Sequence, residues 1–230
     1  MKKILVVDVG GSNVKLMISN RIKRRKFASG PRLTPAQAVA QIKKATADWD
    51  YEAVAIGFPA PVHEGKIMKN PKHLGRGWAG FDFAKALGKP TRLINDAALQ
   101  ALGSYHGGGR MLFLGLGTGL GSALVWQNNV LPLELGDLPY QDEYIIEDWL
   151  GDEGLDQIGR KNWQRETNYA IQQLKLAVIA DYVVLGGGNA CLIEELPKGI
   201  ELGHNRNVYP GGIRLWEDHA KTKRPRWHIM

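Results

Sequence analysis

Cysteine is almost absent from this chain, since Cys191 is the one thiol in 230 residues. One thiol excludes an internal disulfide and a zinc site built from a cysteine cluster, and it suits a reducing compartment such as the cytoplasm. Long apolar runs are missing too. The first run, Met1 to Val7, stops at Asp8, too early for a signal-peptide core, and no stretch is long enough for a transmembrane helix. We therefore expect a cytoplasmic protein without a membrane span.

Acidic residues are too few to balance the basic ones: 23 Asp and Glu stand against 30 Lys and Arg, a formal net charge of +7. Part of the excess lies in two clusters, Arg21 to Lys26 and Lys221 to Arg226. A polyanionic substrate would suit this balance, and so would a merely solvated surface. The basic tail, which also holds Trp227, could bind a nucleic-acid strand or form a disordered end.

The sequence does contain an alternation of strand and helix patterns, which predicts an α/β fold. The predicted strands cover residues 4–8, 14–19, 22–28, 53–57, 91–94, 111–115, 121–126, 130–133 and 182–185. Helices are predicted from Thr34, over residues 81–87, 96–105 and 213–219, and within 143–179, where Trp149, Trp163, Tyr169 and Leu174 would be apolar anchors. Thr34 is the expected N-cap, with Pro35 at the first helical position and Gln37 reaching back.

The run Gly107-Gly108-Gly109 is the clearest hinge, and the pattern of elements restarts after it. Both parts follow one plan: an antiparallel meander with a glycine turn, then helices and a further strand. We therefore predict an N-terminal lobe over residues 1–108 and a C-terminal lobe over residues 109–230, with a basic tail from about residue 221.

Two glycine turns, each between two apolar strands, carry the main functional signal. Each combines glycine with a hydroxyl, in Gly10-Gly11-Ser12 and in Gly117-Thr118-Gly119. Neither matches a Walker P-loop, and the second leads into a strand, unlike a Rossmann motif. A hairpin that needs glycine for a positive φ would explain either turn alone. Because converging N–H groups and hydroxyls suit anions, we predict that the pair grips phosphates from two sides.

Two acidic positions stand at strand ends. Asp8 could accept turn hydrogen bonds or, if its turn binds a nucleotide or polyphosphate, hold magnesium, usually through water. Asn95-Asp96 lies at a strand-to-helix junction and could form a helix N-cap. It could also supply a general base beside a hydroxyl-binding amide, because phosphoryl transfer to an alcohol needs an acceptor for the hydroxyl proton. The two roles are compatible.

Two further segments leave their role open. The acids of Glu134-Leu135-Gly136-Asp137 could bind sugar hydroxyls or calcium, or be solvated. Gly186-Gly187-Gly188 closes a strand before a predicted helix, so it could admit a planar ring or a phosphate to the backbone, or allow a close crossing of strand and helix.

Together these segments resemble, in order, the motifs of the ROK family of sugar kinases, within the actin-like ATPase and sugar kinase superfamily. Asp8 to Ser12 resembles the first phosphate motif, Gly57 to Val62 the Gly-x-Pro-Gly-x-Val segment, Asn95-Asp96-Ala97 the sugar and base motif, Leu116 to Ser122 the second phosphate motif, and Gly186 to Gly188 the adenosine motif. The polyphosphate glucokinase branch is the most similar, through Leu116 to Leu124 and Glu134 to Asp137.

The resemblance implies a two-lobed ribonuclease H-like fold with a cleft between the lobes, and a homodimeric hexose kinase that uses Mg²⁺ with ATP or polyphosphate and no zinc. It implies Asp96 as the base and Asn95, Glu134, Asn70 and Asp137 near the sugar, with Trp78 in the same loop as Asn70. The donor would contact Asp8, Gly10, Gly11, Ser12, Gly117, Thr118, Gly119, Gly186, Gly187 and Gly188. Because the first strand begins at Ile4, no DNA-binding module is expected before it.

Asp137 departs from the family pattern, since the family usually has His at this position. The change puts one sugar contact in question. A catalytically inactive sugar-binding regulator is therefore the alternative to a kinase.

Overall fold

The computed structural model describes residues 2–19, 24–141, 143–219, 222 and 224–230. Its first sheet has the order β3-β2-β1-β4-β7. The first three strands form an antiparallel meander, and β4 and β7 continue it in parallel beside β1. The bounds are β1 (Ile4–Val9), β2 (Asn13–Ile18), β3 (Arg24–Ala28), β4 (Ala53–Phe58) and β7 (Thr91–Asn95).

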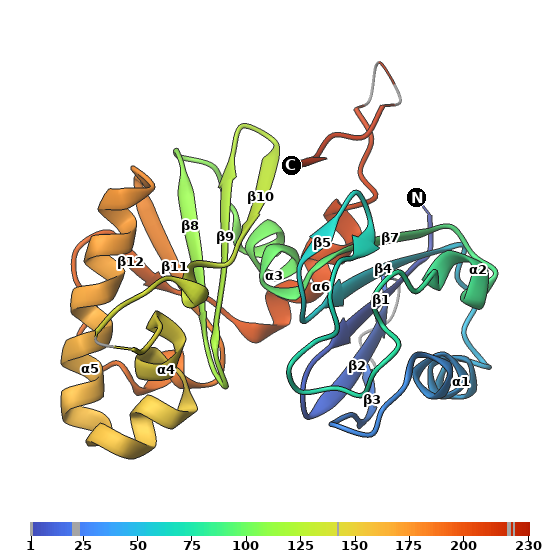
Figure 1. The fold of residues 1–230 in the computed structure, drawn as a ribbon. Coiled ribbons are helices and arrows are strands. Elements are labelled where there is room, and N and C mark those ends of the chain that lie inside the picture. The colour runs from blue at the N-terminus through green and yellow to red at the C-terminus, as the bar shows by residue number, and fades with distance from the viewer. Residues whose placement is uncertain (1, 20–23, 142, 220–221, 223) are drawn as a thin grey trace.

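The second sheet repeats this arrangement, with the order β12-β11-β8-β9-β10-β13 (Figure 1). Strands β8, β9 and β10 form an antiparallel meander, and β11 and β12 continue it in parallel beside β8. The bounds are β8 (Met111–Leu116), β9 (Leu120–Trp126), β10 (Asn129–Leu133), β11 (Tyr182–Gly186), β12 (Ile200–Leu202) and β13 (His228–Ile229). A mixed α/β fold, as the sequence predicts, is therefore confirmed.

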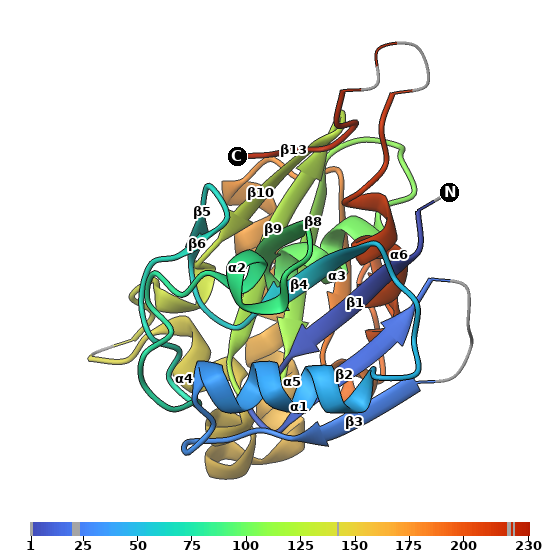
Figure 2. The same ribbon diagram turned by 90° about the vertical axis from the view of Figure 1, so that its right-hand side faces the viewer.

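Helices α3 (Asp96–Ser104) and α6 (Val208–Arg214) lie between the two sheets (Figure 1). Apolar side chains of α3 pack against both: Leu99 shares one core with Val6 of β1 and Phe113 of β8. The outer face of the first sheet is covered by α1 (Pro35–Ala45) and α2 (Phe83–Leu87), as Figure 2 shows for α1. Because α3 begins where β7 ends, its N-terminus is fixed between the sheets.

The outer face of the second sheet is covered by α4 (Ile146–Leu150) and α5 (Asp152–Ala177). Gly159 interrupts α5 with a φ of 72° and a ψ of 157°. The remaining elements are short: the β5 (Val62–His63) and β6 (Lys66–Ile67) hairpin and the 3₁₀ helices η1 (Leu135–Asp137), η2 (Asn189–Leu192) and η3 (Asn205–Asn207). Among the described residues, no helix combines the length and the apolar character needed to cross a bilayer.

The predicted start of α1 is confirmed. Thr34 Oγ1 accepts a hydrogen bond from the Gln37 N–H at 3.4 Å, and Gln37 Oε1 accepts one from the Thr34 N–H at 2.9 Å. Each end of the capping box thus satisfies one backbone donor that the helix itself leaves unpaired.

The last predicted helix, over residues 213–219, is misplaced. Helix α6 covers Val208–Arg214 instead and contains Tyr-Pro-Gly-Gly, a sequence typical of a turn. Pro210 is tolerated because it lies in the first helical turn, where its missing N–H would be unpaired. Gly211 is required by packing, since a Cβ there would overlap the Leu99 carbonyl of α3. The prediction that Tyr169 is an apolar anchor of α5 is also wrong, because this residue is 58% exposed.

The described end of the C-terminal tail, residues 224–230, packs against the rest of the chain. Trp227 is buried and packs edge-to-face on Tyr105, and β13 pairs in parallel with β10 (Figure 2). The Trp227 indole N–H donates a hydrogen bond to Glu217, so this ring is not free to stack on a nucleic-acid base. Lys221 and Lys223 of the predicted cluster lie outside the described residues.

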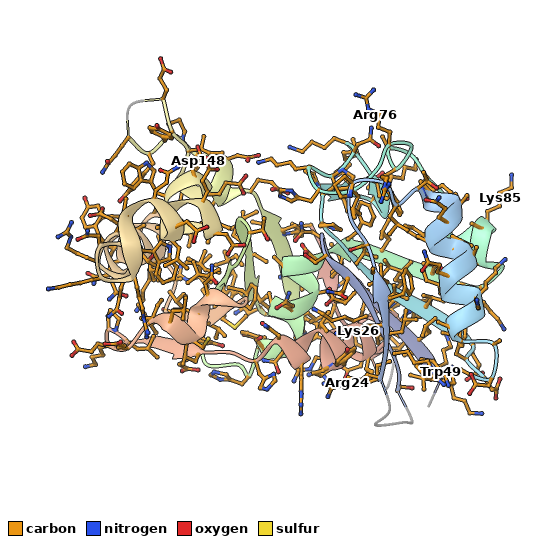
Figure 3. All side chains as sticks on the ribbon, turned by 90° about the horizontal axis from the view of Figure 1, so that it is seen from below. Arg24, Lys26, Trp49, Arg76, Lys85 and Asp148 are labelled. Atoms are coloured by element: carbon orange, nitrogen blue, oxygen red, sulfur yellow. The ribbon has the colours of Figure 1, made fainter. Side chains whose placement is uncertain are left out.

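The first basic cluster is only partly described, because Arg21, Ile22 and Lys23 lie outside the described residues. Arg24 stacks on the Tyr209 ring, at 4.9 Å from its centroid. Arg25 pairs with Asp48 and stacks on Trp49. Figure 3 shows Arg24 and Lys26 along β3 and Trp49 near the same end of the molecule. Both arginines therefore serve local packing.

Candidate active site

A cleft of about 290 Å³ brings the two glycine turns together. The first turn contributes Gly11, and the second contributes Gly117, Thr118 and Gly119. The same wall includes other predicted site residues from distant segments: Asn70, Asn95, Asp96, Glu134, Asp137 and Gly187. Asp8, Gly10, Ser12, Gly186 and Gly188 are not part of the wall, although Gly10 and Ser12 adjoin Gly11, and Gly186 and Gly188 adjoin Gly187. Residues of both turns and Asp96 therefore line one cleft.

A positive φ is not the reason for the glycines in the two turns. None of Gly10, Gly11, Gly117 and Gly119 has φ in the left-handed region, so the alternative of hairpins that need glycine for a positive φ does not apply to them. A Cβ on Gly11 would lie 3.2 Å from the His73 Cβ, and one on Gly119 would overlap the Glu147 carboxylate. A Cβ on Gly117 would meet nothing within 4 Å. Gly117 therefore leaves open room in the cleft for a ligand to approach the backbone.

Asp96 is the first residue of α3 and lies against the cleft. Asn95 supplies the N-cap, because its Oδ1 accepts from the Ala98 N–H at 3.1 Å. Asp96 Oδ1 accepts from the Ala97 N–H at 2.8 Å. Burial, followed by the nearby charges of Asp8 and Glu134, raises the pKa of Asp96 to about 7. A carboxyl with this pKa can both lose and accept a proton near neutral pH.

Asp8 lies behind the first turn and is 5% exposed. Its Oδ2 accepts from Lys15 Nζ at 3.2 Å. Burial raises the pKa of Asp8, and Lys15 opposes the increase. The charge of Asp8 is also one of the causes that raise the pKa of Asp96, and a divalent cation beside Asp8 would offset that charge.

The donor set fits magnesium better than a metal held by protein ligands alone. Within the described ranges, no three His, Cys, Asp or Glu side chains gather to hold a metal ion. Magnesium needs less, because it keeps several waters and binds through one or two carboxylates and substrate phosphates. Asp8, behind the wall of the cleft, could hold such an ion through water.

Glu134 is the N-cap of the 3₁₀ helix η1, Asp137 is its last residue, and both line the cleft. Burial, followed by the charge of Asp137, raises the pKa of Glu134. Asp137 pairs with two lysines of the facing loop: its Oδ2 lies 3.7 Å from Lys69 Nζ, and its Oδ1 lies 3.4 Å from Lys72 Nζ. The charges of Lys69 and Lys72 also act on Glu134 and oppose the increase of its pKa.

The loop that follows β6 carries Asn70 and Trp78. Asn70 Oδ1 accepts from the Trp78 N–H at 2.8 Å, so this amide oxygen shapes the loop. Trp78 is fully buried beside Phe58 and does not line the cleft. The Trp78 side chain therefore belongs to the core under the loop, whereas Asn70 reaches the cleft wall.

Gly187 brings the third glycine run against the second turn. Its φ is 86°, and a Cβ there would overlap the Leu116 carbonyl of β8. The close crossing is thus with a strand. The element that follows is the four-residue 3₁₀ helix η2, so the expected α-helix N-terminus is not present at this turn. Of the three glycines in this run, only Gly187 lines the cleft.

Sequence reasoning missed five polar residues of the cleft wall: Lys69, Lys72, His73, Gln100 and Glu147. Gln100 could have been predicted from the sequence, because it follows Asp96 by four residues and therefore lies on the same face of α3. Its Oε1 is buried without a hydrogen-bond partner, and a ligand in the cleft could supply the missing donor. Lys72 and Glu147 are 75 positions apart and show no such spacing.

The chain is similar in sequence to known glucokinases. Residues 4–132 match the ROK family model. The chain is 22% identical to the polyphosphate glucokinase of Mycobacterium tuberculosis (strain CDC 1551 / Oshkosh), over 90% of this chain and 85% of that protein. It is 27% identical to the glucokinase of Pyrobaculum calidifontis over 58% of this chain, a match that spans only 46% of that protein.

Among solved structures, the crystal structure of the inorganic polyphosphate/ATP-glucomannokinase from Arthrobacter sp. strain KM has the same fold. It aligns with a TM-score of 0.80 at 20% identity, over 92% of this chain and 97% of that one. The family match covers more than half of the chain and includes both glycine turns and Asn95-Asp96. The chain belongs to the ROK family.

Proposed function

We propose that this protein is a hexose kinase that transfers a phosphoryl group from ATP or polyphosphate to the 6-hydroxyl of glucose or a related hexose. One observation carries the proposal: Asp96, a carboxyl with a pKa of about 7, shares a single cleft with both glycine turns. The names of the relatives, glucokinase and polyphosphate/ATP-glucomannokinase, support the same class of reaction.

The repeated plan of the two sheets supports a two-lobed ribonuclease H-like fold. We propose residues 1–108 and 109–230 as the lobes, with the cleft between them. Helix α6 belongs to the second range but packs on β1 of the first, where a Cβ on Gly212 would overlap Val6. Closure of the lobes around the substrates would exclude water, which otherwise competes with the sugar as acceptor.

Asp96 acts as the general base in this proposal and accepts the proton of the 6-hydroxyl as its oxygen attacks the terminal phosphorus. The bond from that phosphorus to the bridging oxygen of the donor breaks, and the donor leaves with one phosphate fewer. Asn95, Asn70 and Glu134 would orient the sugar. The backbones of the two turns and of Gly187 would hold the phosphates. Magnesium, held by Asp8 through water, would supply positive charge beside the transferred group.

A coupled assay for glucose 6-phosphate tests the proposal, run with glucose and each donor in turn. We expect product with ATP, polyphosphate or both. If calorimetry detects glucose binding while no hexose is phosphorylated with either donor, the chain is a sugar binder and not a kinase.

The rate should depend on pH through Asp96. Because the base must be ionised, and burial raises its pKa to about 7, kcat/KM for the hexose should fall about tenfold for each unit below that pH. The profile is measured between pH 5.5 and 8.5, with circular dichroism at each pH to confirm folding. A flat profile down to pH 5.5 would remove Asp96 from the role of base.

The Gly117→Ala substitution should weaken donor binding and leave the fold intact. A methyl group would meet no protein atom within 4 Å, but it would fill the room where a phosphate approaches the backbone. Loss of one hydrogen bond to a charged group corresponds to about a 10- to 100-fold increase in the donor KM. The hexose KM and the melting temperature should change little. An unchanged donor KM would place the phosphates elsewhere.

A further inference from the structure

Lys72 spans the mouth of the cleft between two carboxylates of the opposite side. It belongs to the loop that follows β6, whereas Asp137 ends η1 and Glu147 lies on α4. Lys72 Nζ forms an ion pair with Glu147 Oε1 and lies 3.4 Å from Asp137 Oδ1. All three side chains line the cleft. The cation is thus held by groups that are far apart in the sequence and meet only at this site.

The Glu147 side chain contacts the second glycine turn directly. Its Oε2 accepts a hydrogen bond from the Leu120 N–H at 3.5 Å. The same oxygen fills the space beside Gly119 that a Cβ would need. A carboxylate therefore occupies part of the position at which this turn would receive a phosphate. The turn is already in contact with an anion, and Lys72 neutralises that anion.

The ion pair of Lys72 and Glu147 is poised to exchange partners. The Lys72 side chain is 55% exposed, and surface ion pairs of this kind contribute little to folding. Glu147, followed by Asp137, raises the pKa of Lys72, so its ammonium stays charged throughout the neutral range. A phosphate group carries more negative charge than a carboxylate and offers more oxygens, so it can compete for the same cation.

We propose that Lys72 is a ligand of the donor phosphates, held over the second glycine turn by Asp137 and Glu147 until the donor displaces the Glu147 carboxylate. The inference rests on the proposed function only in taking the cleft as the donor site. It gives Asp137 a role in positioning Lys72, in place of the direct sugar contact expected from the sequence.

Binding of sodium tripolyphosphate, measured by isothermal titration calorimetry in magnesium buffer, tests this inference without requiring turnover. Lys72→Met should weaken binding about 10- to 100-fold, the usual range for one lost charged hydrogen bond. Glu147→Gln should tighten binding several-fold, because the competing anion is gone. Lys85→Met is the matched control with the same change of charge, and its affinity should equal that of the wild type. Figure 3 shows Lys85 at the opposite end of the molecule from Asp148, the neighbour of Glu147.

The opposite signs of the two variants separate a ligand from a structural ion pair. If Lys72 and Glu147 only brace the fold, both substitutions should weaken binding alike and lower the melting temperature, and that result would overturn the inference. Wild-type affinity in Lys72→Met, or no binding of tripolyphosphate by the wild type, would overturn it too. Lys72→Arg should keep most of the affinity, which covers the case of a poorly folded Lys72→Met.

The outcome is distinguishable from the failure of the proposed function. A wild-type protein that binds tripolyphosphate with this pattern, but phosphorylates no hexose, would contradict the kinase and support the phosphate ligand. An active kinase in which Lys72→Met leaves both tripolyphosphate affinity and donor KM unchanged would support the kinase and contradict the role of Lys72 as a phosphate ligand.

Discussion

Replacing Asp96 with asparagine is expected to lower kcat by about 10²- to 10⁴-fold, the usual contribution of a positioned general base. Asparagine keeps the size of the side chain and can still accept the hydrogen bond that the Ala97 N–H donates to Asp96. It cannot accept the hydroxyl proton. The measurement is the turnover of glucose with one donor, at saturating concentrations of both substrates and at pH 8. Near-normal turnover in the folded variant would contradict the proposed mechanism.

Stability supplies an independent control for the same variant. Because the pKa of Asp96 is raised from 3.8 to about 7 on folding, the folded protein binds the proton more tightly than the unfolded chain does. Wild-type stability therefore falls as the pH rises from about 4 to about 7, whereas asparagine does not titrate. Above pH 7 we expect Asp96→Asn to be more stable than the wild type by about 1–4 kcal/mol. If the difference in stability between Asp96→Asn and the wild type were the same at pH 4 and at pH 8, that result would contradict the burial of this carboxyl.

The second large effect is expected at Gly103, where α3 crosses α6. A Cβ on Gly103 would overlap the Asn207 carbonyl and approach the Gly211 nitrogen to 2.7 Å. Both obstacles are backbone atoms, so no side chain can rotate away. We expect Gly103→Ala to destabilise the protein by about 3 kcal/mol and to lower its melting temperature by about 6–12 °C.

Gly188→Ala is the matched stability control for Gly103→Ala. Gly188 has a φ of −66°, and an added Cβ would meet no atom within 4 Å. Its melting temperature should therefore lie within about 2 °C of the wild type, since substitutions away from packed groups are usually near neutral. Equal melting temperatures for the two alanine variants would show that α3 and α6 can move apart freely, and α3 would then be a poor support for Asp96.

Local chemistry explains what the sequence could predict. The capping box at Thr34 and Gln37 uses residues three positions apart, and Asn95 caps the helix that begins at the next residue. The glycine turns were found for the same reason, because each lies between strands that pair with each other. Their meeting at one cleft followed from the resemblance and from the repeated plan of the two sheets.

The remainder depends on contacts between distant segments. Lys72 meets Glu147 and Asp137 only through the tertiary fold, and nothing near Lys72 in the sequence marks it. Helix α6 resembles a turn because its glycines serve the crossing with α3, a need that local propensity does not reveal. Trp227 resembled an exposed aromatic of a basic tail, but it packs on Tyr105, more than a hundred positions earlier in the chain.

A crystal structure with glucose and a non-hydrolysable donor analogue tests the central claim most directly. The account predicts that the glucose 6-hydroxyl lies within about 2.6–3.2 Å of an Asp96 carboxylate oxygen, the range of a proton-transfer hydrogen bond. The terminal phosphate should lie beyond that hydroxyl, on the Gly117–Gly119 backbone. A sugar that presents another hydroxyl to Asp96, or donor phosphates bound outside this cleft, would contradict it.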